Sequence, residues 1–319
     1  MMRHILDWAY KPYLQCIKPF AKYWKRYVKN AFAVLGTVYS FVEIEQTVFK
    51  TDLLLNIFRH HTLLIAFFIL ITTIILSREK IVVSEYFGKN DCFITLKLGN
   101  LLKQKSTAIV IPTNTTFDTT MYDEFISEKS IQGKFQKKFY RNKLEELDKL
   151  LQNSLDEKYP NNYKTLDDRV NSKKRRYPIG SVAKITKNKT HYYFLAMSDV
   201  TAKGKPENVT MQTISEALTG LWKYLDEGEH SEPLALPVIG TGRGRLQDGS
   251  LESVIQTTIL SFISATENDF VAKNLTICIY PPSLKDAKVS WWDLCNQLKS
   301  ICVFQSQIIK KDLAMSSKK

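Results

Sequence analysis

Residues 62–77 form the longest apolar stretch of the chain and contain neither a charged residue nor a proline. At about 1.5 Å per residue they reach roughly 24 Å as a helix, whereas the hydrocarbon core of a bilayer is about 30 Å thick. Extending the stretch back to Leu53 supplies the missing length. The pattern therefore predicts a transmembrane helix over about 53–77, and the alternative is a helix buried in a protein core.

A weaker apolar segment covers 31–49 and includes Glu43 and Glu45. Either it spans the membrane with these acids near one end, or residues 1–49 lie partly in the membrane interface. We favour a span, because it would pair with 53–77 as a hairpin. Basic residues precede the first segment and follow the second, so the positive-inside rule places both termini in the cytoplasm. We thus expect 1–90 to hold a basic region and two membrane helices.

From residue 92 onward, strand-like and helix-like patterns alternate. Short apolar runs predict strands at 93–96, 108–111, 182–185, 192–197, 234–239 and 275–280. Apolar residues at three- and four-residue steps predict helices at 140–157, 211–226, about 251–262 and about 290–301. The alternation predicts that 91–319 is a three-layer α/β/α domain with a mixed, mostly parallel sheet. Such sheets bind ligands at the carboxyl ends of their strands.

Composition narrows the functional classes. The chain has 45 Lys+Arg against 32 Asp+Glu, a net charge of +13. The run 173–176 (Lys-Lys-Arg-Arg) is interpreted as a solvated loop, and no aromatic interleaving supports a nucleic-acid partner. The five cysteines are scattered and form no C-x-x-C pair or Cys/His cluster. Neither a disulfide framework nor a metal site is expected.

The most informative loop follows the predicted strand 234–239. It consists of Gly240, Thr241, Gly242, Arg243 and Gly244, and Arg245 comes next. Alternating glycines allow successive backbone N–H groups to converge on a phosphate, and an arginine can add a bidentate contact. The alternative is a tight β-turn without a ligand.

Two further strands end in polar residues. The strand at 108–111 runs into Pro112 and then into Asn114, Thr116, Phe117, Asp118 and Thr119. The short polar side chains suit ribose hydroxyls, and Phe117 offers a stacking surface. The alternative is an Asx-type turn that binds nothing. The earlier strand, over about 94–98, closes with Gly99 and Asn100.

In order and spacing these three loops resemble a macro domain, over roughly 92–305. Macro domains bind ADP-ribose and its relatives. The resemblance implies that Gly240–Gly244 hold the diphosphate, that Asn114 with Asp118 faces the distal ribose, and that Tyr280 stacks on adenine. Asn100 stands where the family has an acidic residue for the adenine amino group.

The loop after Asn114 departs from the hydrolytic members of the family. In those members a run of glycines follows closely. Here the stretch 117–133 has a single, late glycine, Gly133, which we keep as a binding candidate. Because backbone without glycine approaches a phosphate less closely, binding is favoured over hydrolysis.

A two-span anchor joined to a diverged macro domain resembles the membrane effector of Thoeris anti-phage defence systems. The resemblance implies a partner TIR enzyme that makes an ADP-ribose-derived signal from NAD. This chain would bind the signal without being an enzyme and without a cofactor. It would then oligomerise and disrupt the bacterial inner membrane, with the macro domain in the cytoplasm. The alternatives are a membrane-anchored ADP-ribosyl hydrolase in which Asp118 positions a water, and an anchored binder of nucleic acid or anionic lipid.

Overall fold

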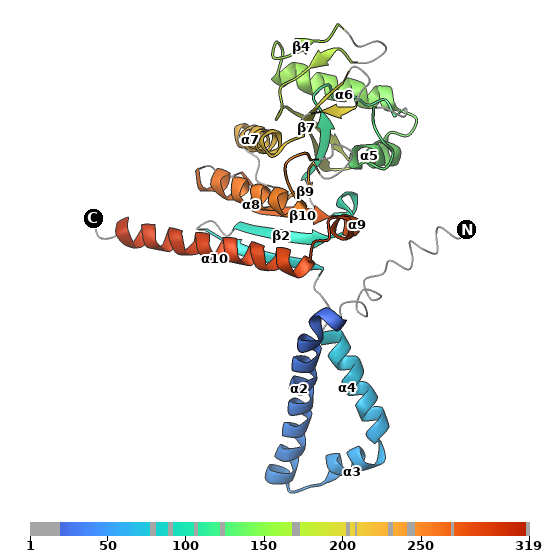
Figure 1. Ribbon diagram of the computed structural model, residues 1–319, viewed down its shortest axis with the longest axis vertical. Coiled ribbons are helices and arrows are strands. Elements are labelled where there is room, and N and C mark those ends of the chain that lie inside the picture. The colour runs from blue at the N-terminus through green and yellow to red at the C-terminus, as the bar shows by residue number, and fades with distance from the viewer. Residues whose placement is uncertain are drawn as a thin grey trace. The chain divides into compact units, whose positions relative to one another are not determined.

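The computed structural model describes residues 20–76, 81–88, 92–104, 108–121, 125–167, 173–201, 205–207, 209–228, 232–240, 246–268 and 271–316. Its contacts divide the chain into two compact units, Met1–Lys80 and Ile81–Lys319 (Figure 1). The sequence placed this division after residue 90. Each unit is described by itself below.

The first unit is made of helices. They are α2 (Phe20–Ile44), the π-helix η2 (Glu45–Phe49), α3 (Leu53–His60) and α4 (Thr62–Leu76). Glu45 is 9% exposed and organises the turn before α3. Its carboxylate accepts hydrogen bonds from the backbone N–H groups of Leu53 (3.0 Å) and Leu54 (2.9 Å), and thereby caps α3.

The helices of this unit do not match the two membrane spans predicted from the sequence, and the prediction is wrong. Residues 53–77 do not form one helix, because the helix breaks at His61, and α4 alone has 15 residues, or about 22 Å. The longer α2 carries several lysines in its first half. Among the described residues, no helix combines the length and the apolar character needed to cross a membrane. This finding contradicts the predicted multi-pass location in the inner membrane.

The second unit contains an eight-stranded sheet in the order β1-β2-β10-β9-β3-β7-β6, with β8 paired to β7. The strands β2, β10, β9, β3 and β7 are parallel, whereas β1, β6 and β8 pair antiparallel with their neighbours. The prediction of a mixed, mostly parallel sheet is therefore confirmed. The bounds are β1 (Val82–Phe87), β2 (Cys92–Leu98), β3 (Ala108–Asn114), β6 (Val182–Lys187), β7 (Thr190–Val200), β8 (Pro206–Glu207), β9 (Leu234–Pro237) and β10 (Asn274–Ile279).

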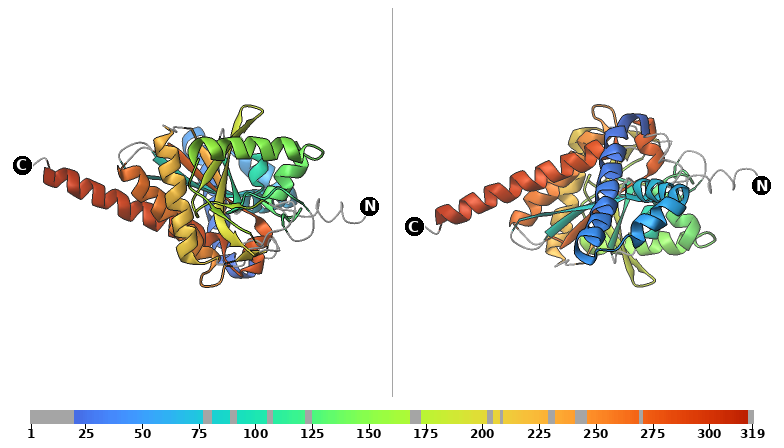
Figure 2. Two further views of the ribbon diagram at one scale, coloured as in Figure 1. Left: turned by 90° about the horizontal axis from the view of Figure 1, so that it is seen from above. Right: turned by 90° about the horizontal axis from the view of Figure 1, so that it is seen from below.

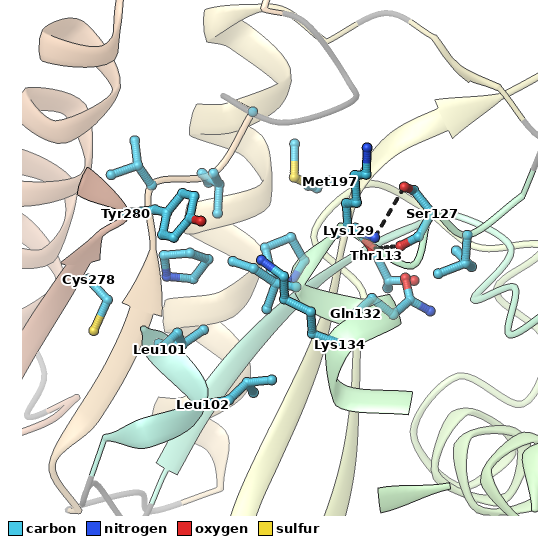
Figure 3. A pocket seen from close by; sticks show the side chains of 18 of the residues that line it. Leu101, Leu102, Thr113, Ser127, Lys129, Gln132, Lys134, Met197, Cys278 and Tyr280 are labelled. Atoms are coloured by element: carbon cyan, nitrogen blue, oxygen red, sulfur yellow. Dashed lines mark hydrogen bonds between the residues drawn. The ribbon is translucent and has the colours of Figure 1, made fainter. Parts of the chain in front are cut away.

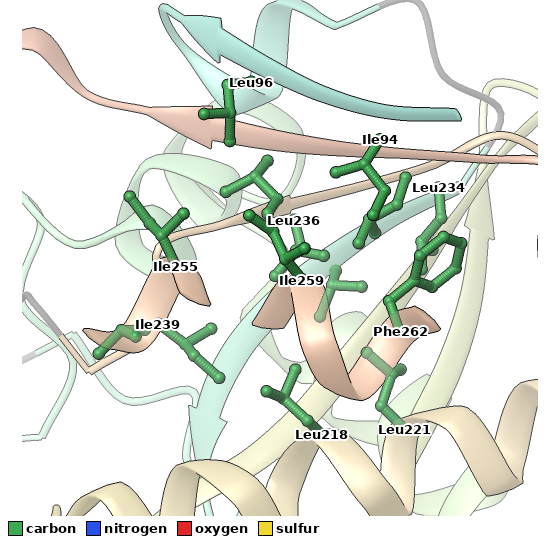
Figure 4. Close-up of a cluster of buried hydrophobic side chains, with 14 of the residues drawn as sticks. Ile94, Leu96, Leu218, Leu221, Leu234, Leu236, Ile239, Ile255, Ile259 and Phe262 are labelled. Carbon is green, nitrogen blue, oxygen red and sulfur yellow. The ribbon is translucent and has the colours of Figure 1, made fainter. Parts of the chain in front are cut away.

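Helices cover both faces of this sheet (Figures 1 and 2). Successive residues of a strand point to opposite faces, and in β3 Val110 joins one apolar cluster while Ile109 and Ile111 join the other. The first cluster includes side chains of α7 (Met211–Glu227) and α8 (Leu251–Asn268) (Figure 4). Side chains of α10 (Trp291–Ser316) belong to the same cluster. The second includes side chains of α5 (Ile131–Phe139) and α6 (Leu144–Lys158).

Short elements complete the unit. They are the 3-10 helix η3 (Leu101–Lys103), the helix α9 (Pro281–Asp286) and the paired strands β4 (Lys164–Thr165) and β5 (Arg175–Arg176). The basic run is only in part the solvated loop predicted from the sequence, because Arg175 and Arg176 form β5 and three of its side chains have carboxylate partners. Lys173 pairs with Asp148 (2.7 Å), Arg175 with Asp156 (2.7 Å) and Arg176 with Asp199 (3.4 Å).

Candidate functional site

A cavity of about 420 Å³ lies at the carboxyl ends of the parallel strands (Figure 3). This is where the ligands of parallel α/β sheets bind. All five parallel strands contribute to it, each with the residues at or just after its end. They are Gly99 and Asn100 after β2, Pro112–Asn114 of β3, Met197 and Ser198 of β7, Pro237–Gly240 at the end of β9, and Cys278 and Tyr280 at the end of β10.

The opposite wall is formed by the segment that leads into α5. Ser130 caps this helix: its Oγ accepts from the N–H of Gly133 (2.9 Å) and donates to the carbonyl of Ser127 (2.7 Å). A Cβ on Gly133 would lie 2.1 Å from the Ser127 carbonyl oxygen. Gly133 does not line the cavity. It allows α5 to pack directly on 127–128, and so it sets the shape of the cavity wall.

Five of the residues proposed from the sequence meet in this cavity, namely Gly99, Asn100, Asn114, Gly240 and Tyr280. Thr116, Phe117, Asp118 and Thr119 are not among the residues that line it. Thr241, Gly242, Arg243, Gly244 and Arg245 lie outside the described residues, so the phosphate loop remains a prediction.

The polar residues after β3 bind one another. The Asn114 side chain donates to the Asp118 carboxylate (2.9 Å) and accepts from the Asp118 backbone N–H (3.1 Å). The Thr116 hydroxyl donates to the same carboxylate (2.6 Å). All three side chains are buried. An Asx turn closes on the backbone two residues on, whereas Asn114 here accepts from the N–H four residues on, and this wider turn fixes the backbone at the end of β3.

Side chains from later in the chain donate hydrogen bonds to the carbonyl groups of the same turn. In α5, Gln132 donates to the carbonyl of Asp118 (2.7 Å) and Gln136 to the carbonyl of Thr119 (2.8 Å). Lys173 donates to the carbonyl of Phe117 (2.8 Å). The backbone carbonyls of the turn are therefore held by side-chain donors from two later segments of the chain, which no local sequence signal reveals.

Phe117 is not the stacking surface that the sequence suggested. Its side chain is 0% exposed, and its ring packs edge-on against Tyr177 with centroids 5.7 Å apart. Its φ of 51° lies in the left-handed region, which residues other than glycine seldom adopt. This conformation turns the ring into the core beneath the turn.

The two residues that the resemblance assigned to adenine also have partners. The Asn100 side-chain oxygen accepts from the N–H of Leu102 (2.9 Å) and caps η3. Tyr280 is 54% exposed, and the Nζ of Lys134 lies 5.0 Å from its ring centroid. The tyrosine therefore offers an accessible aromatic surface at the cavity, with a cation already beside it.

Cys278 contributes a buried thiol to the wall of the cavity. Burial raises the pKa of this thiol to about 12, so the nucleophilic thiolate is scarce at pH 8. We expect iodoacetamide to leave Cys278 unlabelled in the native protein at pH 8 and to label it after unfolding in urea. Peptide mapping by mass spectrometry measures both, and rapid labelling of the native protein would contradict the buried position.

The sheet thus has five parallel strands between antiparallel edges and a cavity at their carboxyl ends. The family model "Thoeris protein ThsA, Macro domain" matches residues 94–280. Since the match covers more than half of the chain, the chain belongs to this family. No curated protein matches it.

Solved structures similar to the chain are also macrodomains. The Oceanobacillus iheyensis macrodomain with MES bound is 11% identical, with 72% of this chain and 99% of that chain covered and a TM-score of 0.45. The same macrodomain with ADP is 13% identical, with 72% and 98% covered and a TM-score of 0.45. The Trypanosoma brucei macrodomain in complex with ADP-ribose is 9% identical, with 61% and 67% covered and a TM-score of 0.40.

Proposed function

We propose that the unit Ile81–Lys319 binds an ADP-ribose-derived nucleotide as a signal in Thoeris defence. The observation that carries the proposal is the cavity at the carboxyl ends of the parallel strands, in a chain of the ThsA macro-domain family. Its volume suits a small molecule. The exposed ring of Tyr280 at its edge suits a purine base.

We further propose that the unit senses the nucleotide and does not hydrolyse it. A general base must reach the proton that it removes. Asp118 is the carboxylate that a hydrolase of this type would use, but it is 2% exposed and does not line the cavity. Its oxygen is occupied by Asn114 and Thr116. The arrangement supports a structural role for Asp118.

The signal would come from a TIR-domain enzyme acting on NAD, and binding would promote self-association. For this, the ligand must bind the assembled state more tightly than the single chain. The helices of the first unit supply a surface that supports association. Several large apolar side chains of these helices are exposed to solvent, for example Phe32 (70% exposed), Leu63 (87%) and Phe68 (74%). Exposed apolar patches mark interaction surfaces.

Titration calorimetry of the full chain with ADP-ribose, ADP and NAD tests the binding step. We expect at least one of them to bind, and Tyr280→Ala to weaken that binding about tenfold through loss of stacking. Tyr86→Ala is the matched control, because Tyr86 is an exposed tyrosine of β1 away from the cavity.

Two further readouts separate the alternatives. Chromatography after incubation of the full chain with ADP-ribosylated protein detects turnover, and light scattering of the nucleotide mixtures detects assembly. Steady conversion of ADP-ribosylated protein would favour the hydrolase over the sensor. No binding of any of these nucleotides, or of small molecules extracted from phage-infected cells that carry the system, would exclude the proposed function.

A further inference from the structure

The charges around the cavity are of one sign. Among the described residues that line it, Lys129 and Lys134 are charged, and no aspartate or glutamate occurs. Both lysines are exposed. In Figure 3, Lys134 extends from α5 toward Tyr280. Since no carboxylate is among the described residues that line the cavity, these two ammonium groups create a positive potential at it, which favours an anionic ligand.

A buried hydroxyl in the same cavity lacks a partner. Thr113, at the end of β3, is 5% exposed, and its Oγ1 makes no hydrogen bond among the described residues. A buried polar group without a partner costs about 1–3 kcal/mol. Thr113 lines the cavity, as Lys129 does. A ligand oxygen in the cavity would therefore satisfy this hydroxyl.

The start of α5 adds a third contribution. Ser130 caps this nine-residue helix and lines the cavity together with Ile131 and Gln132. The N-terminal end of a helix carries partial positive charge and favours anions. Lys129 stands just before the cap and Lys134 one turn into the helix, so both cations lie at the same end of the helix dipole.

We propose that the cavity selects its ligand by negative charge, and that Lys129 and Lys134 are the residues that determine this selectivity. Their ammonium groups bind phosphate oxygens of a nucleotide with two or more phosphates, and the Thr113 hydroxyl donates to the same group. Side-chain charge thus takes the place that a run of glycines would have in this segment. The inference rests on the proposed function, because it names the contacts of that same nucleotide site.

The test compares adenine compounds with and without a diphosphate group. Calorimetric titration of the full chain with ADP-ribose, ADP and adenosine measures the contribution of the phosphates. We expect the double variant Lys129→Met, Lys134→Met to bind ADP-ribose and ADP at least tenfold more weakly than the wild type. The reason is that a charge-assisted hydrogen bond is roughly twice as strong as a neutral one. Adenosine affinity stays unchanged. Raising the salt concentration lowers the affinity of the wild type for ADP more than it lowers that of the double variant.

Lys149→Met is the matched control, because Lys149 is an exposed lysine of α6 that does not line the cavity. It should bind ADP as the wild type does. Thr113→Val gives a second readout. It should lower the affinity for ADP severalfold. The melting temperature should stay equal or rise, because the substitution removes a buried hydroxyl that has no hydrogen-bond partner among the described residues.

The outcomes separate the two proposals. If the wild type binds ADP-ribose and the double lysine variant binds it equally well, charge selection is wrong and the proposed function stands. Equal losses for ADP and adenosine would also overturn charge selection, because the lysines would then support the shape of the cavity. If the wild type binds neither ADP-ribose nor ADP, charge selection is wrong, and the titration with small molecules extracted from phage-infected cells then decides whether the proposed function stands.

Discussion

Replacing Gly220 by alanine is expected to destabilise the second unit by about 3 kcal/mol, the upper end of the usual cost of overpacking. Gly220 lies in α7, where a Cβ would meet the Gly180 carbonyl oxygen at 2.4 Å and the Gly180 Cα at 2.6 Å. Gly180 cannot retreat easily, because its φ is +83° and its N–H donates to the carbonyl of Ala196 in β7 (2.8 Å). The helix and the loop therefore touch backbone to backbone.

The sign of this effect is diagnostic. Inside a helix, alanine is about 1 kcal/mol more favourable than glycine, so local propensity alone predicts that Gly220→Ala stabilises the protein. Chemical denaturation followed by circular dichroism measures the free energy of unfolding. Thr219→Ala is the control at the neighbouring exposed position of α7 and should change stability little. A Gly220→Ala variant as stable as the wild type would mean that the close contact does not exist.

The central strands were predictable from the sequence for a physical reason. Parallel strands buried on both faces read as continuous apolar runs, and the runs at 108–111 and 192–197 lie within β3 and β7. The edge strand β1 was missed, because it alternates exposed and half-buried residues. The short, polar helix α5 was missed too, since its buried glutamines serve the turn after β3.

The apolar stretch 53–77 was misread as one membrane helix. Composition records how apolar a segment is, but not that the helix breaks at His61. The break depends on local geometry that hydropathy does not contain.

For the candidate site, too, the sequence predicted some of the residues and missed others that only the three-dimensional packing brings to the cavity. The rule that ligands bind at strand ends pointed to Asn114, Gly240 and Tyr280, which line one cavity in the structure. It could not locate Lys129 and Lys134, because they reach the cavity through the packing of α5 on the sheet. It also misjudged Phe117, since nothing local distinguishes an aromatic ring that faces a ligand from one that a left-handed backbone turns inward.

The second large effect is expected at Asp118. Replacement by alanine removes the acceptor for two buried donors, the Asn114 amide (2.9 Å) and the Thr116 hydroxyl (2.6 Å). Each donor left unpaired costs about 1–3 kcal/mol. Because the turn can relax in part, we expect Asp118→Ala to lower the free energy of unfolding by about 3 kcal/mol and to weaken ADP-ribose binding through distortion of the end of β3.

Asp118→Asn distinguishes this structural role from catalysis. The asparagine keeps one side-chain oxygen of the same reach, which can accept from Asn114 and Thr116, so we expect most of the stability and of the ADP-ribose binding to survive. A hydrolase that used Asp118 as its base would differ in its turnover and not in its binding. The variant would bind normally and lose turnover, since an amide does not take up a proton near neutral pH. Thermal unfolding, calorimetry and an assay of ADP-ribosyl release, each applied to the wild type, Asp118→Ala and Asp118→Asn, decide between the two roles. Only if Asp118 is a catalytic base does Asp118→Asn lower the rate of release without lowering stability.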